Sequence, residues 1–305
     1  MNVDITKLNK VIKRTINNKK VSGGVINIES GNNELSYLKA EGNMEEDSLF
    51  AIASITKLFT TTVIFNLIEN NILSFEDTLG NFFDEDILKG LHILNDKDYS
   101  HSVTIKQLIS HRSGLADYST EKPKGESSYF DEIFEKDRGI TFEEILIKTK
   151  KLKPHFINGI EGKAFYSDIN FDILGVILEK ATNKNLEELY NEYIILPLNL
   201  SSTFLCKEDS NYSSIYRGKE KLSINNAVSC AKASGGIISN SQDLMKFLKA
   251  FFKGELFSKI YLENETWNRI QWFPIEYGVG IMRCKISRIM SPFFPAPEIR
   301  GTQDL

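Results

Sequence analysis

The sequence has little of what marks disulfide-rich or metal-binding proteins. Its 305 residues include 3 cysteines, 7 prolines and 4 histidines. Cys206, Cys230 and Cys284 are scattered and match no metal-ligand spacing, and an odd number of cysteines favours reduced, structural thiols. The histidines also lack the spacing of a zinc hydrolase. We therefore expect no bound metal.

Long apolar runs and a strong charge of one sign are also absent. No stretch approaches the roughly 18 apolar residues of a transmembrane helix, so we expect no membrane span. The first residues lack the basic and then apolar pattern of a signal peptide, which favours a cytoplasmic location. A net charge of -4 argues against nucleic acid as a partner. With 41% hydrophobic residues, the chain can bury a core and is long enough for two domains.

The first chemical signal is Ser54-Ile55-Thr56-Lys57, which places a hydroxyl and an amine one helical turn apart. Apolar residues near a 3.6-residue period predict a helix over 56–70. Ser54 and Lys57 would then share one face, at the helix end that favours negative charge. An amine that takes the serine proton is what a serine acyl-transfer enzyme requires. The alternative for an isolated match is an N-cap serine followed by a solvated lysine.

Ser-x-x-Lys also begins at Ser36, Ser119 and Ser229. Ser36 lies in a predicted strand, where residues three apart face opposite sides. Ser119 is near Pro123 and Gly125, which predicts an exposed loop. Ser229 precedes two glycines that would break a helix. The context therefore selects Ser54.

A second pattern, within 162–175, places Tyr166 and Asp168 two residues apart before an apolar helical stretch. Together with the segments 54–57 and 104–115, it makes the chain resemble the serine β-lactamase and penicillin-binding-protein superfamily. The closest resemblance is to the class C-like branch, which also contains esterases and D-amino-acid peptidases. Segments 73–77, 197–203 and 234–239 follow in that family's order, so the resemblance covers most of the chain.

The resemblance implies an α+β fold, in which an antiparallel sheet flanked by helices carries an inserted, mainly helical domain. We expect residues 1–79 and 233–305 to form a discontinuous sheet domain and residues 80–232 to form the helical domain, with the active site in the cleft between them. The patterning agrees with this plan. It predicts a helix over 4–18, and strands over 24–29, 34–41 and 277–286 that join in one sheet.

The resemblance also implies roles for three residues. Ser54 would be the nucleophile, Lys57 its general base, and Tyr166 the group that passes a proton to the leaving group. Such a reaction needs no metal and no organic cofactor. A neutral lysine at pH 7 requires its charged form to be destabilised by roughly 4 to 5 kcal/mol.

The sequence departs from the family at two places. Asp168 stands where the family has asparagine, and a carboxylate near Lys57 would favour the charged ammonium. The family's third motif, a Lys-Thr-Gly or His-x-Gly triplet, has no clear counterpart: Arg300-Gly301 resembles its lead-in and Thr302 follows. We take Asp168, Arg300 and Thr302 as candidate substrate-binding residues. Either the chain is part of a longer protein or its sheet is unfinished, and an unfinished sheet edge would favour self-association.

We therefore predict a serine hydrolase that forms an acyl-enzyme with a small-molecule substrate. β-Lactams, D-amino-acid peptides and small esters all remain open, because enzymes for the three share these residues and differ in pocket shape. A cytoplasmic location would count against cell-wall peptide. The alternative is a penicillin-binding or vestigial ligand-binding protein of the same fold with little turnover.

Overall fold

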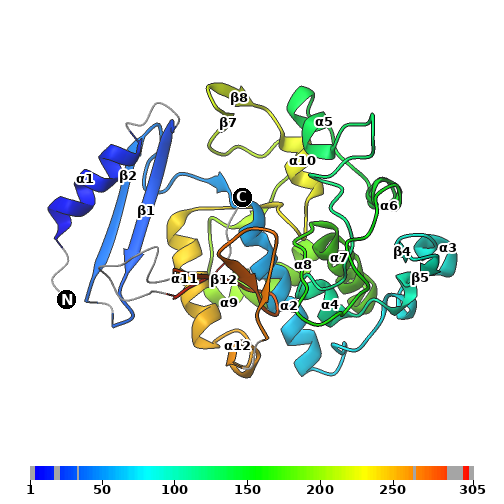
Figure 1. Ribbon diagram of the computed structural model, residues 1–305. Helices are drawn as coiled ribbons and strands as arrows, with labels where there is room; N and C mark the ends of the chain where they lie inside the picture. Colours follow the sequence, from blue (N-terminus) through cyan, green and yellow to red (C-terminus); the bar gives the residue numbers. More distant parts are fainter. Residues whose placement is uncertain (1–3, 17–20, 33, 264–265, 287–297, 302–305) are drawn as a thin grey trace.

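The computed structural model describes residues 4–16, 21–32, 34–263, 266–286 and 298–301, and it mixes helices and strands (Figure 1). The helices are α1 (Ile5–Ile16), α2 (Thr56–Glu69), α3 (Glu85–Leu88), α4 (Ile105–Ile109), α5 (Tyr129–Glu135), α6 (Phe142–Lys150), α7 (Ile169–Thr182), α8 (Leu186–Tyr190), α9 (Leu196–Leu198), α10 (Asn225–Cys230), α11 (Ser241–Lys253) and α12 (Ile260–Glu263). Short helical turns are η1 (Ala53–Ile55), η2 (Leu79–Asn81), η3 (Ser100–Ser102) and η4 (Asn191–Ile195).

The strands form several small antiparallel sheets. Their bounds are β1 (Gly23–Glu29), β2 (Ser36–Gly42), β3 (Phe50–Ala51), β4 (Ile93–Leu94), β5 (Lys97–Asp98), β6 (Phe204–Leu205), β7 (Ile215–Arg217), β8 (Glu220–Leu222), β9 (Ile237–Ser239), β10 (Asn268–Arg269), β11 (Ile275–Tyr277), β12 (Met282–Lys285) and β13 (Glu298–Gly301). The two larger sheets have the orders β3-β9-β6 and β10-β11-β12-β13, and the other strands pair as hairpins.

Helix α2 lies at the centre of the main hydrophobic core (Figure 1). Almost all of its side chains are buried, on every face, as expected of a helix that is enclosed by other elements. It contacts α7, α8 and η4, and the ring of Phe59 stacks on Phe247 of α11 with 4.0 Å between centroids. This packing holds the N-terminal end of α2, and therefore Ser54 and Lys57, in a fixed place.

Helix α7 brings the second motif to that end of α2. Its first residues continue directly from Tyr166 and Asp168, and its apolar side chains pack against α2 and α4. The short pairing of β3 with β9 brings the segment before β9 to the same end of α2. In this pairing, Ile52 N–H donates to the carbonyl of Ile237 at 2.9 Å. Segments far apart in the sequence therefore meet beside Ser54.

The β1–β2 hairpin lies between α1 and α11 (Figure 1). Its register runs from Gly23 opposite Gly42 to Glu29 opposite Ser36. Asn27 Nδ2 donates to the carbonyl of Ser241 at 3.1 Å, and Lys249 pairs with Glu29. These contacts attach the hairpin to the first residue of α11 and to Lys249, about two turns further along.

The structure confirms the predicted helix over 56–70 as α2, and the strands over 24–29 and 34–41 as β1 and β2. The prediction of a single strand over 277–286 was wrong, because two strands, β11 and β12, meet there at a tight turn. Gly280 in this turn has φ +72°, and a Cβ on it would lie 2.3 Å from Thr61 Cγ2. The turn therefore packs tightly against α2. This close contact and the positive φ require glycine at position 280.

The prediction that strands from the first and last parts of the chain join in one sheet is confirmed only in part. β3 joins the first part of the chain to β9 in the last part, but within the described residues β1–β2 and β10–β13 belong to separate sheets. The proposed division into residues 1–79 with 233–305 and residues 80–232 stays a prediction. No helix in the described ranges is both long and apolar enough to cross a membrane.

Candidate active site

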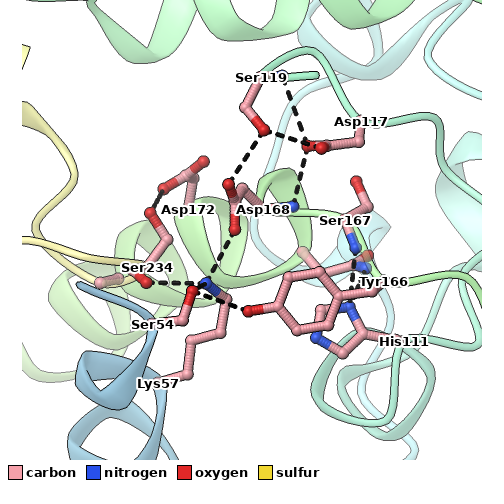
Figure 2. A network of polar contacts seen from close by, with 12 residues as sticks. Ser54, Lys57, His111, Asp117, Ser119, Tyr166, Ser167, Asp168, Asp172 and Ser234 are labelled. Carbon is pink, nitrogen blue, oxygen red and sulfur yellow. Dashed lines mark hydrogen bonds and ion pairs between the residues drawn. The ribbon is translucent and has the colours of Figure 1, made fainter. Parts of the chain in front are cut away.

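Ser54 lies in the helical turn η1, immediately before α2. Its Oγ accepts a hydrogen bond from Lys57 Nζ at 3.0 Å and another from the Tyr166 hydroxyl at 2.9 Å (Figure 2). The preceding residue, Ala53, has φ +43°, a left-handed backbone that is rare outside glycine and asparagine. The strained turn projects the hydroxyl between an amine and a phenol.

Lys57 is buried, with 1% of its surface exposed. Its Nζ donates to Ser54 Oγ at 3.0 Å, to Asp168 Oδ1 at 2.8 Å and to the carbonyl of Ser234 at 2.7 Å. An ammonium has three donors and no acceptor, so the three partners match the charged form. Burial by itself lowers the pKa of Lys57, but the charge of Asp168, with a smaller effect of Tyr166, outweighs burial and raises that pKa overall.

Tyr166 is held by ring contacts and by its backbone. Its ring stacks on His111 at 4.3 Å and lies 5.5 Å from Trp272, centroid to centroid. Gln271 pairs with both backbone groups of Tyr166, accepting from its N–H at 2.8 Å and donating to its carbonyl at 2.9 Å. Burial raises the pKa of Tyr166, an effect that the nearby Lys57 reduces without cancelling. The phenol is therefore neutral and can donate a proton.

His111 supports this arrangement from below the tyrosine ring (Figure 2). Its Nδ1 accepts from the Ser167 N–H at 3.1 Å and lies 2.9 Å from Asn170 Nδ2. Burial, and then the charge of Lys57, hold the pKa of His111 well below its ordinary value. The imidazole is thus a neutral support that orients the motif residues Tyr166 to Asp168.

A second carboxylate lies behind Asp168. The Ser119 hydroxyl is 2.7 Å from Asp117 Oδ2 and 3.0 Å from Asp168 Oδ2. A hydroxyl carries one hydrogen, so it can donate to only one of these carboxyl groups at a time. Burial, and then the charge of Asp168, raise the pKa of Asp117. Ser119 therefore links the carboxyl groups of Asp117 and Asp168 beside Lys57.

Asp172 forms a third acidic contact with the site, one turn along α7 from Asp168. It accepts from the Ser234 hydroxyl at 2.7 Å and from the Tyr118 hydroxyl at 3.0 Å. Burial, followed by the charge of Asp168, raises the pKa of Asp172 to about 7. Through Ser234, whose carbonyl accepts from Lys57, Asp172 helps to orient the lysine.

Of the candidate residues, the structure brings Ser54, Lys57, Tyr166 and Asp168 together. It places Arg300 on β13, where its guanidinium bonds to Glu298 at 2.8 Å and lies 5.6 Å from the centroid of the Trp267 ring. A substrate-binding role for Arg300 stays a prediction. Thr302 lies outside the described residues.

Sequence reasoning missed several residues of the site. Ser119 was predicted to lie in an exposed loop, which is wrong: only 2% of its surface is exposed. Asp117, Asp172 and Ser234 were not singled out either. The one available signal was Asp172, four residues after Asp168 and hence on the same helical face. The burial of Asp117 and Ser119 has no local sequence signature.

Comparison with known proteins identifies the family of the chain. The sequence model described as Beta-lactamase matches residues 8–272. The chain belongs to the beta-lactamase family. The predicted membership is thereby confirmed.

Individual relatives of this beta-lactamase-family chain are distant. It is 27% identical over 214 residues to "Beta-lactamase-like protein 2" of Dictyostelium discoideum. That alignment covers 67% of this chain and 36% of that protein. It is also 24% identical over 214 residues to the "D-alanyl-D-alanine-carboxypeptidase/endopeptidase AmpH" of Escherichia coli K12. That alignment covers 70% of this chain and 51% of that protein. The chain thus spans about half or less of the length of these relatives.

A solved structure shows the same fold. The D-stereospecific amidohydrolase from Streptomyces sp. superimposes with a TM-score of 0.76 at 24% identity, covering 98% of this chain and 87% of that one. The predicted α+β, beta-lactamase-like fold is therefore confirmed. Within the described ranges, the beta-lactamase-family chain has no group of three or more His, Cys, Asp or Glu side chains that could hold a metal ion.

Proposed function

We propose that this chain is a serine hydrolase that works through an acyl-enzyme on Ser54. The observation that carries the proposal is the convergence of Lys57 Nζ and the Tyr166 hydroxyl on Ser54 Oγ, at 3.0 Å and 2.9 Å. The E. coli relative, named a carboxypeptidase/endopeptidase, and the Streptomyces amidohydrolase are hydrolases by name. Their names support the class of reaction and leave the substrate open.

In the proposed reaction, Ser54 Oγ attacks the carbonyl carbon of the substrate while Lys57, in its neutral form, takes the serine proton. The positive N-terminal end of α2 stabilises the negative charge that develops on the carbonyl oxygen. The bond to the leaving group then breaks, Tyr166 gives the leaving group a proton, and Lys57 replaces the proton on Tyr166. Water finally attacks the Ser54 ester, which releases the acid and restores the serine.

The ion pair of Lys57 with Asp168 limits this reaction. With Nζ protonated and its three hydrogens directed at Ser54, Asp168 and Ser234, the lysine has no lone pair with which to accept the serine proton. The first step therefore requires the minor, neutral form of Lys57. This observation favours the second candidate function in its ligand-binding form, a protein of the same fold with little turnover.

Labelling with a fluorophosphonate and with a fluorescent penicillin tests the proposal. We expect Ser54 to be labelled and Ser54→Ala to remove the labelling and any ester hydrolysis. Ser229→Ala is the matched control, because Ser229 begins another Ser-x-x-Lys sequence. Decay of the penicillin adduct would indicate turnover, and a stable adduct would favour the second candidate. Labelling of another serine, found by peptide mapping, would overturn the assignment of Ser54.

We also infer a small-molecule substrate, with β-lactams, D-amino-acid peptides and small esters as the candidate classes. The cytoplasmic location, the absence of nucleic acid partners and self-association stay predictions.

A further inference from the structure

A cavity of about 330 Å³ opens beside Ser54 and extends away from the catalytic groups. Ser54, Asp168 and Gly235 are among the residues that line it. Its outer walls come from α5, β7 and the segment around α10, which lie together above the N-terminal end of α2 (Figure 1). The side chains that line these walls are mainly apolar: Phe130, Ile133, Phe134, Ile215, Ile224 and Val228.

The charge of the cavity is as informative as its shape. Asp168 is the one carboxylate among the described lining residues, and no lysine, arginine or histidine is among them. Asp168 is itself paired with Lys57. A carboxylate placed against these lining residues would therefore leave water with no cation among them to pair with, which is unfavourable. An apolar group would instead replace water against aromatic and branched aliphatic side chains.

The position of Tyr166 decides which part of a substrate enters the cavity. Tyr166 reaches Ser54 from the side of His111, while Asp168 and Ser234 lie on another side of the hydroxyl (Figure 2). The residues that line the cavity include Asp168 and Ser234, and Tyr166 is not one of those described. In the proposed function Tyr166 protonates the leaving group, so the leaving group lies on its side. The cavity is then left for the acyl group.

The walls of the cavity are fixed before any ligand binds. The guanidinium of Arg217 lies 4.8 Å from the centroid of the Phe134 ring, and the rings of Phe130 and Phe134 are 6.1 Å apart. Asp137, just after α5, accepts from the backbone N–H groups of Asn226 and Ala227, both at 3.0 Å. These two hydrogen bonds tie the end of α5 to α10, so a bound acyl group does not need to order the two helices.

We propose that this cavity binds an uncharged, apolar acyl group, so that the chain prefers esters or amides of medium-length aliphatic or aryl acids. Acetyl groups are too short to reach the walls, and acyl groups that carry a carboxylate are disfavoured. The proposal rests on the proposed function, because it names the substrate class of the same site.

The test is a series of p-nitrophenyl esters with acetate, butyrate, hexanoate and glutarate as the acyl group, with Ser54→Ala as the background. We expect kcat/KM to rise by at least about 10-fold from acetate to hexanoate, the usual size for added methylenes in an apolar pocket. The glutarate half-ester, similar in length but anionic, should react more slowly than hexanoate.

Two variants locate the effect in the cavity. Val228→Phe fills it and should lower the hexanoate-to-acetate ratio of kcat/KM by about 10-fold, and Phe134→Ala enlarges it and should shift the preference towards longer chains. The ratio is measured on one preparation, so a partly unfolded variant does not disturb it. Leu196→Phe on α9, where 73% of the side chain is exposed, is the control that should leave the ratio unchanged.

The outcomes separate this inference from the proposed function. Failure of a small alkyl fluorophosphonate to label Ser54 would overturn both. Labelling of Ser54 without a rise from acetate to hexanoate, or with equal turnover of the glutarate half-ester, would overturn the cavity assignment alone. A ratio that responds to Leu196→Phe as strongly as to Val228→Phe would also overturn it.

Discussion

Lys57 Nζ lies 2.8 Å from Asp168 Oδ1, at the position from which, in the proposed reaction, it takes the proton of Ser54. The short distance stabilises the ammonium, which is the form that cannot act as a base. The same carboxylate accepts from the Ser119 hydroxyl, which also lies 2.7 Å from Asp117 Oδ2. The acidic network around Lys57 therefore controls how often the lysine is neutral.

The first prediction concerns this pair. In Asp168→Asn the charge that raises the pKa of Lys57 is gone and the effect of burial, which lowers that pKa, remains. The neutral amine then becomes more abundant at pH 7, by about tenfold per unit of pKa change. We expect fluorophosphonate labelling of Ser54 to accelerate at pH 7 and its pH profile to move to lower pH.

The matched control is Glu126→Gln, which removes an exposed carboxylate 2.8 Å from Lys151. It should leave the labelling rate and its pH profile unchanged. Slower labelling of Asp168→Asn at every pH would show that Asp168 assists the reaction instead of restraining it.

The second prediction concerns the proton-transfer groups. Lys57→Ala and Tyr166→Phe should each slow acylation of Ser54 by about 10² or more, the usual contribution of a general acid or base. Lys122→Ala, in another Ser-x-x-Lys sequence, should have no such effect, because Lys122 pairs with Asp131 at the surface. Chelation with EDTA should also have none. Loss of activity with EDTA but not with Lys57→Ala would contradict the mechanism.

The third prediction is a pH dependence of stability from Asp172. Its pKa in the folded protein is raised to about 7, so between the unfolded pKa of about 3.9 and pH 7 the folded state binds more protons than the unfolded state. The contribution of Asp172 to the free energy of unfolding is therefore fully present below the unfolded pKa. It is lost as the pH rises through about 7, the pKa in the folded protein.

Asparagine does not titrate, so Asp172→Asn should become more stable relative to the parent protein as pH rises from 5 to 8. Urea unfolding at each pH measures the two free energies of unfolding. The expected change in their difference is a few kcal/mol at most, at about 1.4 kcal/mol per pKa unit. A constant or opposite difference would contradict the assignment of a raised pKa to Asp172.

The fourth prediction concerns self-association. β13 is an outer strand of its sheet, paired with β12 in the described part of the chain, and Ile299 on it is exposed. An exposed edge with an apolar side chain favours pairing with another chain. We expect light scattering to show association that grows with concentration, and Ile299→Lys to reduce it.

Leu196→Lys replaces an exposed aliphatic side chain on α9, away from the edge strands, and should not reduce association. A stable monomer at all concentrations, with rapid turnover of an ester or β-lactam, would contradict this prediction and show that the chain needs no partner at β13.

The sequence by itself determined the features that depend on neighbouring residues. Ser54 and Lys57 meet because a helix places residues three apart on one face, and the apolar pattern that predicts α2 is local. The order of the motifs was enough to indicate the family, and Asp168 was recognisable as an unusual carboxylate near Lys57.

Only the tertiary structure decided how the protons are arranged and where a substrate fits. Asp117, Ser119 and Ser234 act on Lys57 or Asp168 from segments that are distant from them in the sequence, and no periodicity reports such contacts. Gly280 turns the chain into two strands because the turn presses on Thr61 of α2. Pairing distances, burial and pKa values depend on which side chains exclude water together, and that is fixed when α2, α7 and the β3–β9 pair pack around the site.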